Sequence, residues 1–322
     1  MLRLGKLDND DLDRLVLKKF RRIRPESLSS PTIGQDCAVV DLGSDLLVLS
    51  CDPITSASVA HLGRLTVHVS CNDAAAAGAE PVGLLVTLLM PPTGTMEQIA
   101  QIADDLSAAA QLANVDILGG HTEVTDAVTR AVTSATVIAK QSRNQILRGM
   151  RPADDIVMTK YAAVEGTTIL AEDFIDHLSS VPTELLTAAR ALSGQLSIVA
   201  ESSIAMQNGA VAMHDVTEGG VLGASWELGF ANNCSVEIYT ANIPVREETR
   251  ALCAALALDP LRLIGSGSLL IACENGNLLC SALQKAGIPA AIIGKAIEGA
   301  TSYVDGSVLE EPHADELYRL YS

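Results

Sequence analysis

Strand-like apolar segments alternate with helix-like segments along most of this chain, and this alternation restricts the fold more than any other feature. Before residue 140, the strand-like segments CAVVDL, LLVLSCD and EPVGLLVTLLMP accompany helical patterns at about 64–78 and 96–113. After residue 155, the strand-like segments DIVMTK, AVAMHD, CSVEIY, SLLIAC and AAIIGK alternate with further helical patterns. Alternation of this kind predicts α/β domains.

A polar stretch at 140–155, which contains Gly149 and Pro152, interrupts the alternation and is the best linker in the chain. A chain of 322 residues is long for one core and suits two domains of ordinary size. We therefore predict domains at residues 1–145 and 150–322.

Local patterns add three expectations about the elements. An amphipathic helix is expected over about 10–23, and the strand VDIL is expected to end in a turn at Gly119-Gly120. The segment GSGSLL at 265–270 is expected to be a turn that enters a strand, since it lacks the third glycine of a dinucleotide fingerprint.

Composition and charge exclude several classes of partner. Hydrophobic residues make up 48% of the chain and aromatic residues only 3%, so the cores must be built mainly from Ala, Val, Leu and Ile. The formal net charge is −17, whereas a protein that binds a phosphate backbone needs a basic surface. Few aromatic side chains are present to stack on unpaired bases. We expect no nucleic-acid partner.

The sequence also argues against a membrane protein or a disulfide-bonded one. No stretch approaches the roughly 20 uninterrupted apolar residues of a membrane span. The segment MLRLGKLDNDDLDRLVLKKF carries charge throughout and has no apolar signal core. Seven cysteines show no C-x-x-C spacing, which is typical of buried thiols in a reducing compartment. We expect a cytoplasmic protein.

Oxygen-bearing side chains gather at the predicted ends of strands and helices. In HDVTEGG, Asp215, Thr217 and Glu218 lead directly into Gly219 and Gly220. Three further acids lie at other element ends, namely Asp36, Asp52 and Asp73. A solvated or capping acid is the commoner interpretation of any one of them, but side chains at element ends can also converge on a ligand.

The combination of these acids with paired glycines indicates a phosphate ligand and a cation. Glycines at a strand-to-helix turn let backbone N–H groups approach a phosphate, and a helix N-terminus favours negative charge. Carboxylates alone would repel a nucleotide triphosphate, so a hard cation is required between them, and Mg²⁺ fits because it takes one or two carboxylates with water and phosphate oxygens.

Cysteines adjoin three of these acids, in Asp36-Cys37, Cys51-Asp52 and Cys71-Asn72-Asp73, so a thiolate metal site is a less favoured alternative. Neighbours on a strand point to opposite faces, so in the first two pairs an acid that faces a site would put its cysteine into the core. Signatures of a P-loop, a dinucleotide fingerprint, a serine hydrolase and a zinc protease are absent from the sequence.

The motifs taken in order resemble those of the aminoimidazole ribonucleotide synthetase (PurM-like) superfamily, and most strongly its hydrogenase-maturation branch. The matching segments are GQDCAVVD, CDPI, GRLTVHVSCNDAAAAGAEPVGLL, GGHTEV, HDVTEGGVLGASWELG, GSGSLLIA and IGK. The resemblance implies a two-domain α/β (α+β) fold, with an N-terminal β-rich domain that dimerises and a C-terminal α/β domain. It also implies ATP and Mg²⁺ as cofactors.

The resemblance assigns roles by position. Asp36, Asp52 and Asp73 look like Mg²⁺ ligands, and Asp215 and Glu218 look like ligands of further metal. The residues expected to contact the nucleotide or its phosphates are Asn72, Gly119, Gly120, His121, Thr217, Gly219 and Gly220. No catalytic residue is assigned.

The sequence departs from the family pattern at informative places. Gln35 precedes Asp36 where a second acid is common, and His121 follows the two glycines where relatives carry an acid, with Glu123 two residues on. A histidine here either contacts phosphate as an imidazolium or is a structural residue bonded to a nearby carboxylate. Residues 316–322, ELYRLYS, contain no cysteine, so we expect no carrier thiol of the hydrogenase-maturation type.

The leading hypothesis is an ATP- and Mg²⁺-dependent enzyme that phosphorylates or activates an oxygen of a small, unidentified substrate. A non-catalytic nucleotide-binding homodimer that acts as a scaffold or maturation factor is the second hypothesis. An enzyme of the same fold that uses another phosphorylated ligand is the third. A homodimer built mainly from residues before about 140 is expected, because strands 46–51 and 81–90 are more hydrophobic than one-sided cover requires.

Overall fold

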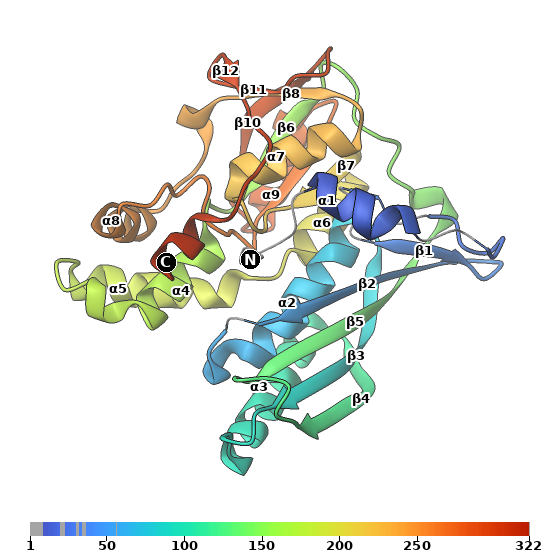
Figure 1. The fold of residues 1–322 in the computed structure, drawn as a ribbon. Coiled ribbons are helices and arrows are strands. Elements are labelled where there is room, and N and C mark those ends of the chain that lie inside the picture. Colours follow the sequence, from blue (N-terminus) through green and yellow to red (C-terminus); the bar gives the residue numbers. More distant parts are fainter. Residues whose placement is uncertain (1–8, 20–22, 30–31, 34–36, 56, 322) are drawn as a thin grey trace. The chain divides into compact units, whose positions relative to one another are not determined.

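The computed structural model describes residues 9–19, 23–29, 32–33, 37–55 and 57–321 of the chain. They form two compact units, drawn in Figure 1. We call residues 23–29 and 37–146 the N-terminal unit, and residues 147–321 with the described residues before 20 and at 32–33 the C-terminal unit. None of the described helices is long and apolar enough to cross a membrane.

The N-terminal unit combines one sheet with two long helices. Its elements are β1 (Ala38–Asp41), β2 (Leu46–Ile54), α2 (Val59–Ala76), β3 (Glu80–Met90), α3 (Met96–Ala113), β4 (Asp116–Val124) and β5 (Val132–Gln141). The described strands form a five-stranded sheet in the order β1-β2-β5-β3-β4, in which only the pair β3–β4 is parallel. Helix α2 packs against β2, β3 and β5, and α3 packs against α2.

The strands alternate between a face that meets α2 and a second face, which we call the outer face. On β3, Leu84, Val86 and Leu88 are buried, whereas Leu85 is 45% exposed. Leu88 pairs with Thr133 of β5, whose hydroxyl lies 2.5 Å from that of Thr66 on α2, so the buried set faces the helix. Leu85 therefore belongs to the outer face, since successive side chains of a strand point to opposite sides.

Helices α2 and α3 cross very closely, and this fixes the position of α2. A Cβ added at Gly63 of α2 would lie 2.5 Å from the backbone nitrogen of Leu106 on α3, so only glycine fits there. Beside it, Arg64 donates from its backbone N–H and its Nε to the carboxylate of Asp105, at 2.7 and 3.0 Å. These contacts hold the first half of α2, the helix whose last turns carry Asp73.

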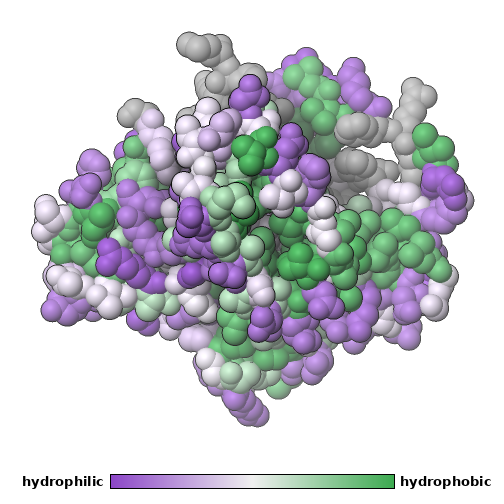
Figure 2. Space-filling view, turned by 90° about the horizontal axis from the view of Figure 1, so that it is seen from below, coloured by the Kyte–Doolittle hydropathy of each residue, from purple (hydrophilic) through white to green (hydrophobic). Residues whose placement is uncertain are grey.

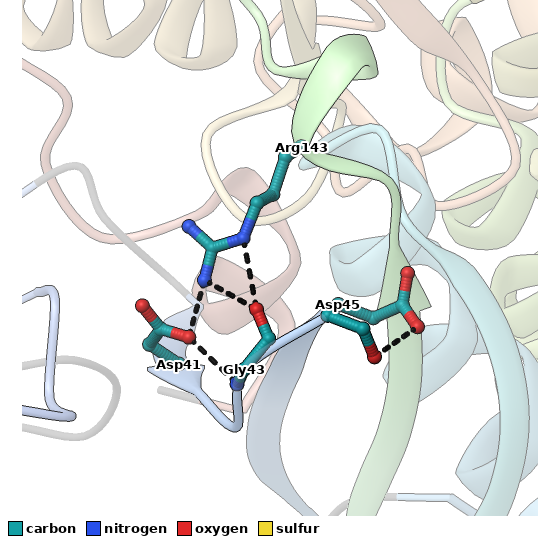
Figure 3. Close-up of polar contacts among 5 residues, drawn as sticks. Asp41, Gly43, Asp45 and Arg143 are labelled. Atoms are coloured by element: carbon teal, nitrogen blue, oxygen red, sulfur yellow. Dashed lines mark hydrogen bonds and ion pairs between the residues drawn. The ribbon is translucent and has the colours of Figure 1, made fainter.

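The turn between β1 and β2 is tied to the chain that leaves β5, as Figure 3 shows. Arg143 donates to the carboxylate of Asp41 and, at 3.1 and 3.2 Å, to the carbonyl oxygen of Gly43. The Gly43 N–H in turn donates to Asp41 at 2.9 Å. The Arg143 guanidinium holds the pKa of Asp41 below its usual range, so the carboxylate stays charged and the clamp persists at neutral pH.

The expected turn at Gly119-Gly120 is wrong, because both glycines lie inside β4. Their φ angles of 152° and 147° lie in a region that side-chain-bearing residues rarely adopt. A Cβ at Gly120 would lie only 1.8 Å from the carbonyl oxygen of Val86, so glycine is required for β4 to pair with β3. The glycine pair marks a close backbone approach within a strand, a use of glycine that the sequence pattern alone does not separate from a turn.

The C-terminal unit is a larger α/β assembly. Its strands are β6 (Asp155–Thr159), β7 (Ala210–Asp215), β8 (Ser235–Ile238), β9 (Leu269–Cys273), β10 (Ala290–Ile297), β11 (Tyr303–Val304) and β12 (Ser307–Val308). Its helices include α4 (Val164–Asp173), α5 (Thr183–Ala191), α6 (Val199–Gln207), α7 (Gly220–Ala231), α8 (Glu247–Leu256) and α9 (Gly276–Lys285). The described strands form a seven-stranded sheet in the order β12-β11-β8-β10-β6-β9-β7.

Two apolar clusters hold this unit together. In one cluster, Val221 and Leu228 of α7 pack with Ile156 and Leu270 of the sheet. In the other, residues of α4, α5 and α8 pack with Leu317, near the end of the chain. The second cluster therefore anchors the C-terminal segment to the body of the unit.

The predicted elements differ from the structure mainly at the two ends of the chain. The helix expected over about 10–23 is shorter, with α1 at Asn9–Leu15 followed by a 3₁₀ turn at Leu17–Lys19, while residues 20–22 lie outside the described residues. The short strands β11 and β12 and the 3₁₀ helix Glu316–Leu320 were not predicted, because segments of two to five residues carry no usable periodicity. The segment GSGS at 265–268 is the expected turn before β9.

Candidate functional site

The predicted site residues form two groups, one in each unit. The group in the N-terminal unit centres on Asp52 of β2 and Asp73 of α2. The hydroxyl of Ser50 lies 2.5 Å from Oδ2 of Asp73 and 3.3 Å from Oδ2 of Asp52. Two carboxylates that are 21 residues apart in the chain are therefore brought to either side of one hydroxyl.

The local structure explains this convergence. Ser50 and Asp52 are two residues apart on β2 and so point to the same face, which is the face that α2 covers. Asp73 lies in the last turns of α2 and is only 7% exposed. A hydroxyl has a single hydrogen to donate, so Ser50 cannot serve both carboxylates at once and does not neutralise the pair.

This donor set fits Mg²⁺. Hard oxygen ligands suit this ion, and it needs only one or two carboxylates when phosphate oxygens and water fill the other positions. Within the described part of the chain, no group of three or more His, Cys, Asp or Glu side chains is placed to hold a metal ion. The pair Asp52–Asp73 nevertheless supplies the carboxylates that a magnesium–phosphate site requires. Asp36, the third predicted ligand, lies outside the described residues.

The neighbouring cysteines do not form a thiolate site with these acids. Cys51 points away from Asp52, as expected, but the expectation that it enters the core is wrong, because the outer face of the sheet leaves it exposed. Cys71 is buried, and this burial, with Asp73 nearby, raises its pKa to about 12. A thiol with such a pKa stays protonated at neutral pH and is a poor metal ligand. Asn72, which lies between Cys71 and Asp73 in the sequence, is fully buried in α2.

The structure places His121 on the other side of the sheet from Asp52 and Asp73. His121 pairs with Thr87, and Glu123 pairs with Leu89, and both partners alternate with the buried residues of β3. His121 and Glu123 therefore lie on the outer face, with Nε2 and Oε2 3.4 Å apart and both side chains more than half exposed. Glu123 is thus the nearby carboxylate that a structural role of His121 requires. Within the N-terminal unit, His121 does not approach the Asp52–Asp73 pair.

The second group of predicted residues lies where β7 leads into α7. Asp215 ends the strand and is buried, Thr217 and Glu218 are partly buried, and Gly220 begins the helix. Gly220 has a φ of 63°, and a Cβ there would lie 2.5 Å from the carbonyl oxygen of Leu261. Its glycine identity therefore has a structural cause in the close packing of this loop.

Residues near the end of the chain contact this loop directly. The N–H of Gly219 donates to Oδ2 of Asp315 at 2.7 Å, and the Tyr318 hydroxyl donates to Oε1 of Glu218 at 3.0 Å. In this structure the Gly219 amide, which was expected to face a phosphate, thus has a carboxylate of its own chain as partner.

Several carboxylates surround the loop, and their electrostatics are coupled. Burial raises the pKa of Glu165, at the start of α4, to about 7, with a smaller contribution from Asp315 and Glu218. Burial likewise raises the pKa of Asp315 to about 6, against the hydrogen bonds from Leu317, Gly219 and Ile264. Burial and Glu218 also raise the pKa of Tyr318. Negative charge is therefore crowded at this end of the C-terminal unit.

Four residues of these groups escaped sequence reasoning, namely Ser50, Glu165, Asp315 and Tyr318. The two-residue spacing of Ser50 and Asp52 was a usable signal. For the other three no signal exists, because tertiary folding brings them to the loop from positions about 50 and 100 residues away.

Comparisons with known proteins agree with the two-unit structure. Residues 34–140 match the family model of the AIR synthase related protein, N-terminal domain, and residues 151–306 match that of the C-terminal domain. The carbamoyl dehydratase HypE of Azotobacter vinelandii is 28% identical over 254 residues, which cover 76% of this chain and 72% of that protein.

Solved structures share the fold. The structure of AaThiL complexed with AMPPCP and TMP superposes with a TM-score of 0.76 at 19% identity, over 97% of this chain and 98% of that one. The hydrogenase maturation protein HypE in complex with ATP gives a TM-score of 0.72 at 21% identity, over 96% of both chains. The expected two-domain α/β fold of the PurM-like type is confirmed. The chain is similar to HypE proteins, and it belongs to the AIR synthase related family.

Proposed function

We propose that this protein is an ATP- and Mg²⁺-dependent enzyme that transfers a phosphoryl group to an oxygen of a small substrate and so activates that oxygen for displacement. The observation that carries the proposal is that the carboxylates of Asp52 and Asp73 both lie close to the Ser50 hydroxyl. Together they form a set of hard oxygen ligands, which Mg²⁺ prefers. The similarity to carbamoyl dehydratases and to folds solved with ATP or AMPPCP supports an ATP-dependent enzyme.

Asp52 and Asp73 would hold Mg²⁺, with the Ser50 hydroxyl donating to Asp73, the nearer of the two carboxylates. When bound, the ion neutralises charge on the transferred phosphoryl group, and catalysis then consists mostly of positioning and electrostatic stabilisation. Asp215 and Glu218 are proposed to bind further metal, and Thr217 is proposed to contact the nucleotide. We also propose that residues 1–145 carry the ATP- and Mg²⁺-binding and dimerisation functions, and that residues 150–322 form the second domain.

Turnover of ATP separates this proposal from a scaffold role. ADP formation by the purified protein is to be measured with Mg²⁺ across three classes of oxygen acceptor, namely carboxylic acids, amides and alcohols. Acceptor-dependent ADP formation that disappears in Asp73→Asn would support the enzyme. Tight ATP binding with no ADP formation across all three classes would contradict it and favour a non-catalytic nucleotide-binding scaffold.

A homodimer formed through the outer face of the N-terminal sheet is part of the proposal. Leu85 of β3 is 45% exposed there, and Leu118 of the edge strand β4 is 51% exposed. Figure 2 shows broad hydrophobic areas on one side of the molecule. Exposed apolar area of this kind on a sheet is typical of a protein–protein interface.

Light scattering is expected to give about twice the chain mass of 33.7 kDa for the wild type at micromolar concentration. Leu85→Asp should shift the population to monomer, because it buries a charge in the proposed interface. Leu112→Asp is the matched control, since Leu112 is 84% exposed on α3 and should tolerate the charge. A monomeric wild type would contradict the dimer.

The thiol chemistry favours a cytoplasmic location, which we propose as well. Burial raises the pKa of Cys71, Cys253 and Cys273 to about 12. Thiols that stay protonated and unpaired suit a reducing compartment.

A further inference from the structure

We infer that Tyr318 is a positioning residue for Glu218, so that the C-terminal segment completes the metal-binding loop of the C-terminal unit. The inference rests on the proposed function, which makes Glu218 a metal ligand. The contact itself is direct, since the Tyr318 hydroxyl donates to Oε1 of Glu218 at 3.0 Å across 100 residues of sequence. A hydrogen bond from a neighbouring group fixes the orientation of a carboxylate that binds metal.

The segment that carries Tyr318 is firmly anchored. The carboxylate of Asp315 accepts from the N–H groups of Leu317 at 2.9 Å and of Gly219 at 2.7 Å, so it joins the segment to the residue that follows Glu218. Leu317 is 6% exposed within the apolar cluster of α4, α5 and α8. Glu316 accepts from the N–H of Asp259 at 3.0 Å. The Tyr318 hydroxyl is thus presented by a fixed turn of the backbone.

Charge makes this donor important. Glu165 and Asp315 both lie within electrostatic reach of Glu218, so three carboxylates repel one another around one loop. Among the described residues, Oε2 of Glu165 is buried without a hydrogen-bond partner, although Ser266 forms hydrogen bonds with this carboxylate group. Under these conditions the Tyr318 hydroxyl supplies a donor that holds Glu218 in place against the repulsion.

The segment also shapes the loop sterically. A Cβ at Gly219 would lie 3.3 Å from Cβ of Pro312, so the residues before Asp315 pack against the backbone that follows Glu218. Asp315 and Tyr318 therefore act on two consecutive residues, Gly219 through its amide and Glu218 through its carboxylate. The segment therefore holds both the backbone next to the proposed metal ligand Glu218 and the side chain of Glu218 itself.

Tyr318→Phe removes only the hydroxyl and is the main variant of the test. The full-length protein is titrated with ATP at increasing Mg²⁺, and separately with Mn²⁺ alone by electron paramagnetic resonance. We expect Tyr318→Phe to lower the affinity for Mn²⁺, and the affinity for Mg²⁺ seen in ATP binding, by about ten-fold. A loss of this size is usual when an outer partner of a metal ligand is removed. Thermal melting should fall by no more than about 4 °C, the effect of one hydrogen bond.

A double-mutant cycle separates positioning from a general structural effect. In the background Glu218→Gln, adding Tyr318→Phe should change metal binding no further, because the residue through which Tyr318 acts is already altered. Tyr239→Phe is the control, since Tyr239 is 40% exposed outside this cluster. An equal loss with and without Glu218→Gln would overturn the positioning role.

The outcomes distinguish this inference from the proposed function. Mg²⁺-dependent ATP binding that is unchanged in Tyr318→Phe would overturn the inference and leave the function intact. Mn²⁺ binding that depends on Tyr318 and Glu218 in a protein that does not bind ATP would support the inference and contradict the function. Absence of both metal and ATP binding would overturn both.

Discussion

Asp73→Asn is expected to weaken Mg²⁺-dependent binding of ATP by about 100-fold or more, since loss of even an outer partner of a metal ligand costs 10–100-fold. The substitution replaces a buried carboxylate by an amide of nearly the same shape, so it removes charge from the proposed cation site and leaves the packing of α2 intact. Ser50, 2.5 Å away, keeps an acceptor oxygen to which it can donate. Isothermal titration of ATP with Mg²⁺ measures the effect.

Asp104→Asn is the matched control for this experiment. Asp104 is an exposed acid on α3 of the same unit, so it tests the effect of losing one negative charge from the surface. We expect its affinity for ATP to stay within about two-fold of the wild type, since exposed charges are strongly screened. An Asp73→Asn protein that is folded by circular dichroism and binds ATP as the wild type does would contradict the site assignment.

Gly120→Ala is expected to destabilise the N-terminal unit by about 3 kcal/mol or more, the range of severe steric and backbone strain. A methyl group there would lie 1.8 Å from the carbonyl oxygen of Val86, in a parallel pair of strands whose separation is set by backbone hydrogen bonds. Neither strand can move away without breaking those bonds. The φ angle of 147° adds further strain.

Gly119→Ala provides the comparison for this substitution. Its φ angle of 152° is similar, but a methyl group there would meet only Cδ2 of Leu85 at an ordinary 3.8 Å. We expect Gly119→Ala to lower the free energy of unfolding only by the contribution of backbone strain, about 1 kcal/mol. Urea denaturation followed by circular dichroism measures both free energies of unfolding. Equal losses for the two variants would contradict the close approach of β4 to β3.

Most elements of the fold follow from patterns in the sequence. The apolar run of β3 and the amphipathic pattern of α3, Met96–Ala113, are strong signals, and the structure forms a strand and a helix at these places. The two glycines of β4 do not form the predicted turn, and the need for Gly120 comes from Val86, 34 residues earlier, where two backbones approach each other. Such an approach leaves no local pattern.

The candidate site was predictable only where its members share an element or belong to the motifs of the family. Asp52 and Asp73 were both predicted, and the structure places them at one hydroxyl. Asp315 and Tyr318 were missed, since only the packing of Leu317 into the C-terminal unit brings them to Glu218 and Gly219. Nothing in the local sequence of a short 3₁₀ turn indicates such a long-range contact.

His121 shows a different limit of sequence reasoning. Its place after two glycines suggested a phosphate contact, whereas the pairing of His121 with Thr87 puts its side chain on the outer face beside Glu123. Because side chains alternate between faces, a shift of one residue in register decides which face a side chain meets. The register is set here by the irregularity between Leu84 and Leu85, which the sequence does not reveal.

The central claim is that the carboxylates of this chain bind ATP through Mg²⁺, and isothermal titration of the wild-type protein with ATP tests it most directly. The titration is run once with Mg²⁺ and once with a chelator in its place. The account predicts saturable binding with Mg²⁺ and a loss of at least about ten-fold in affinity without it, since carboxylates and triphosphate repel each other when no cation lies between them. Equal affinity under the two conditions, or no binding under either, would contradict it.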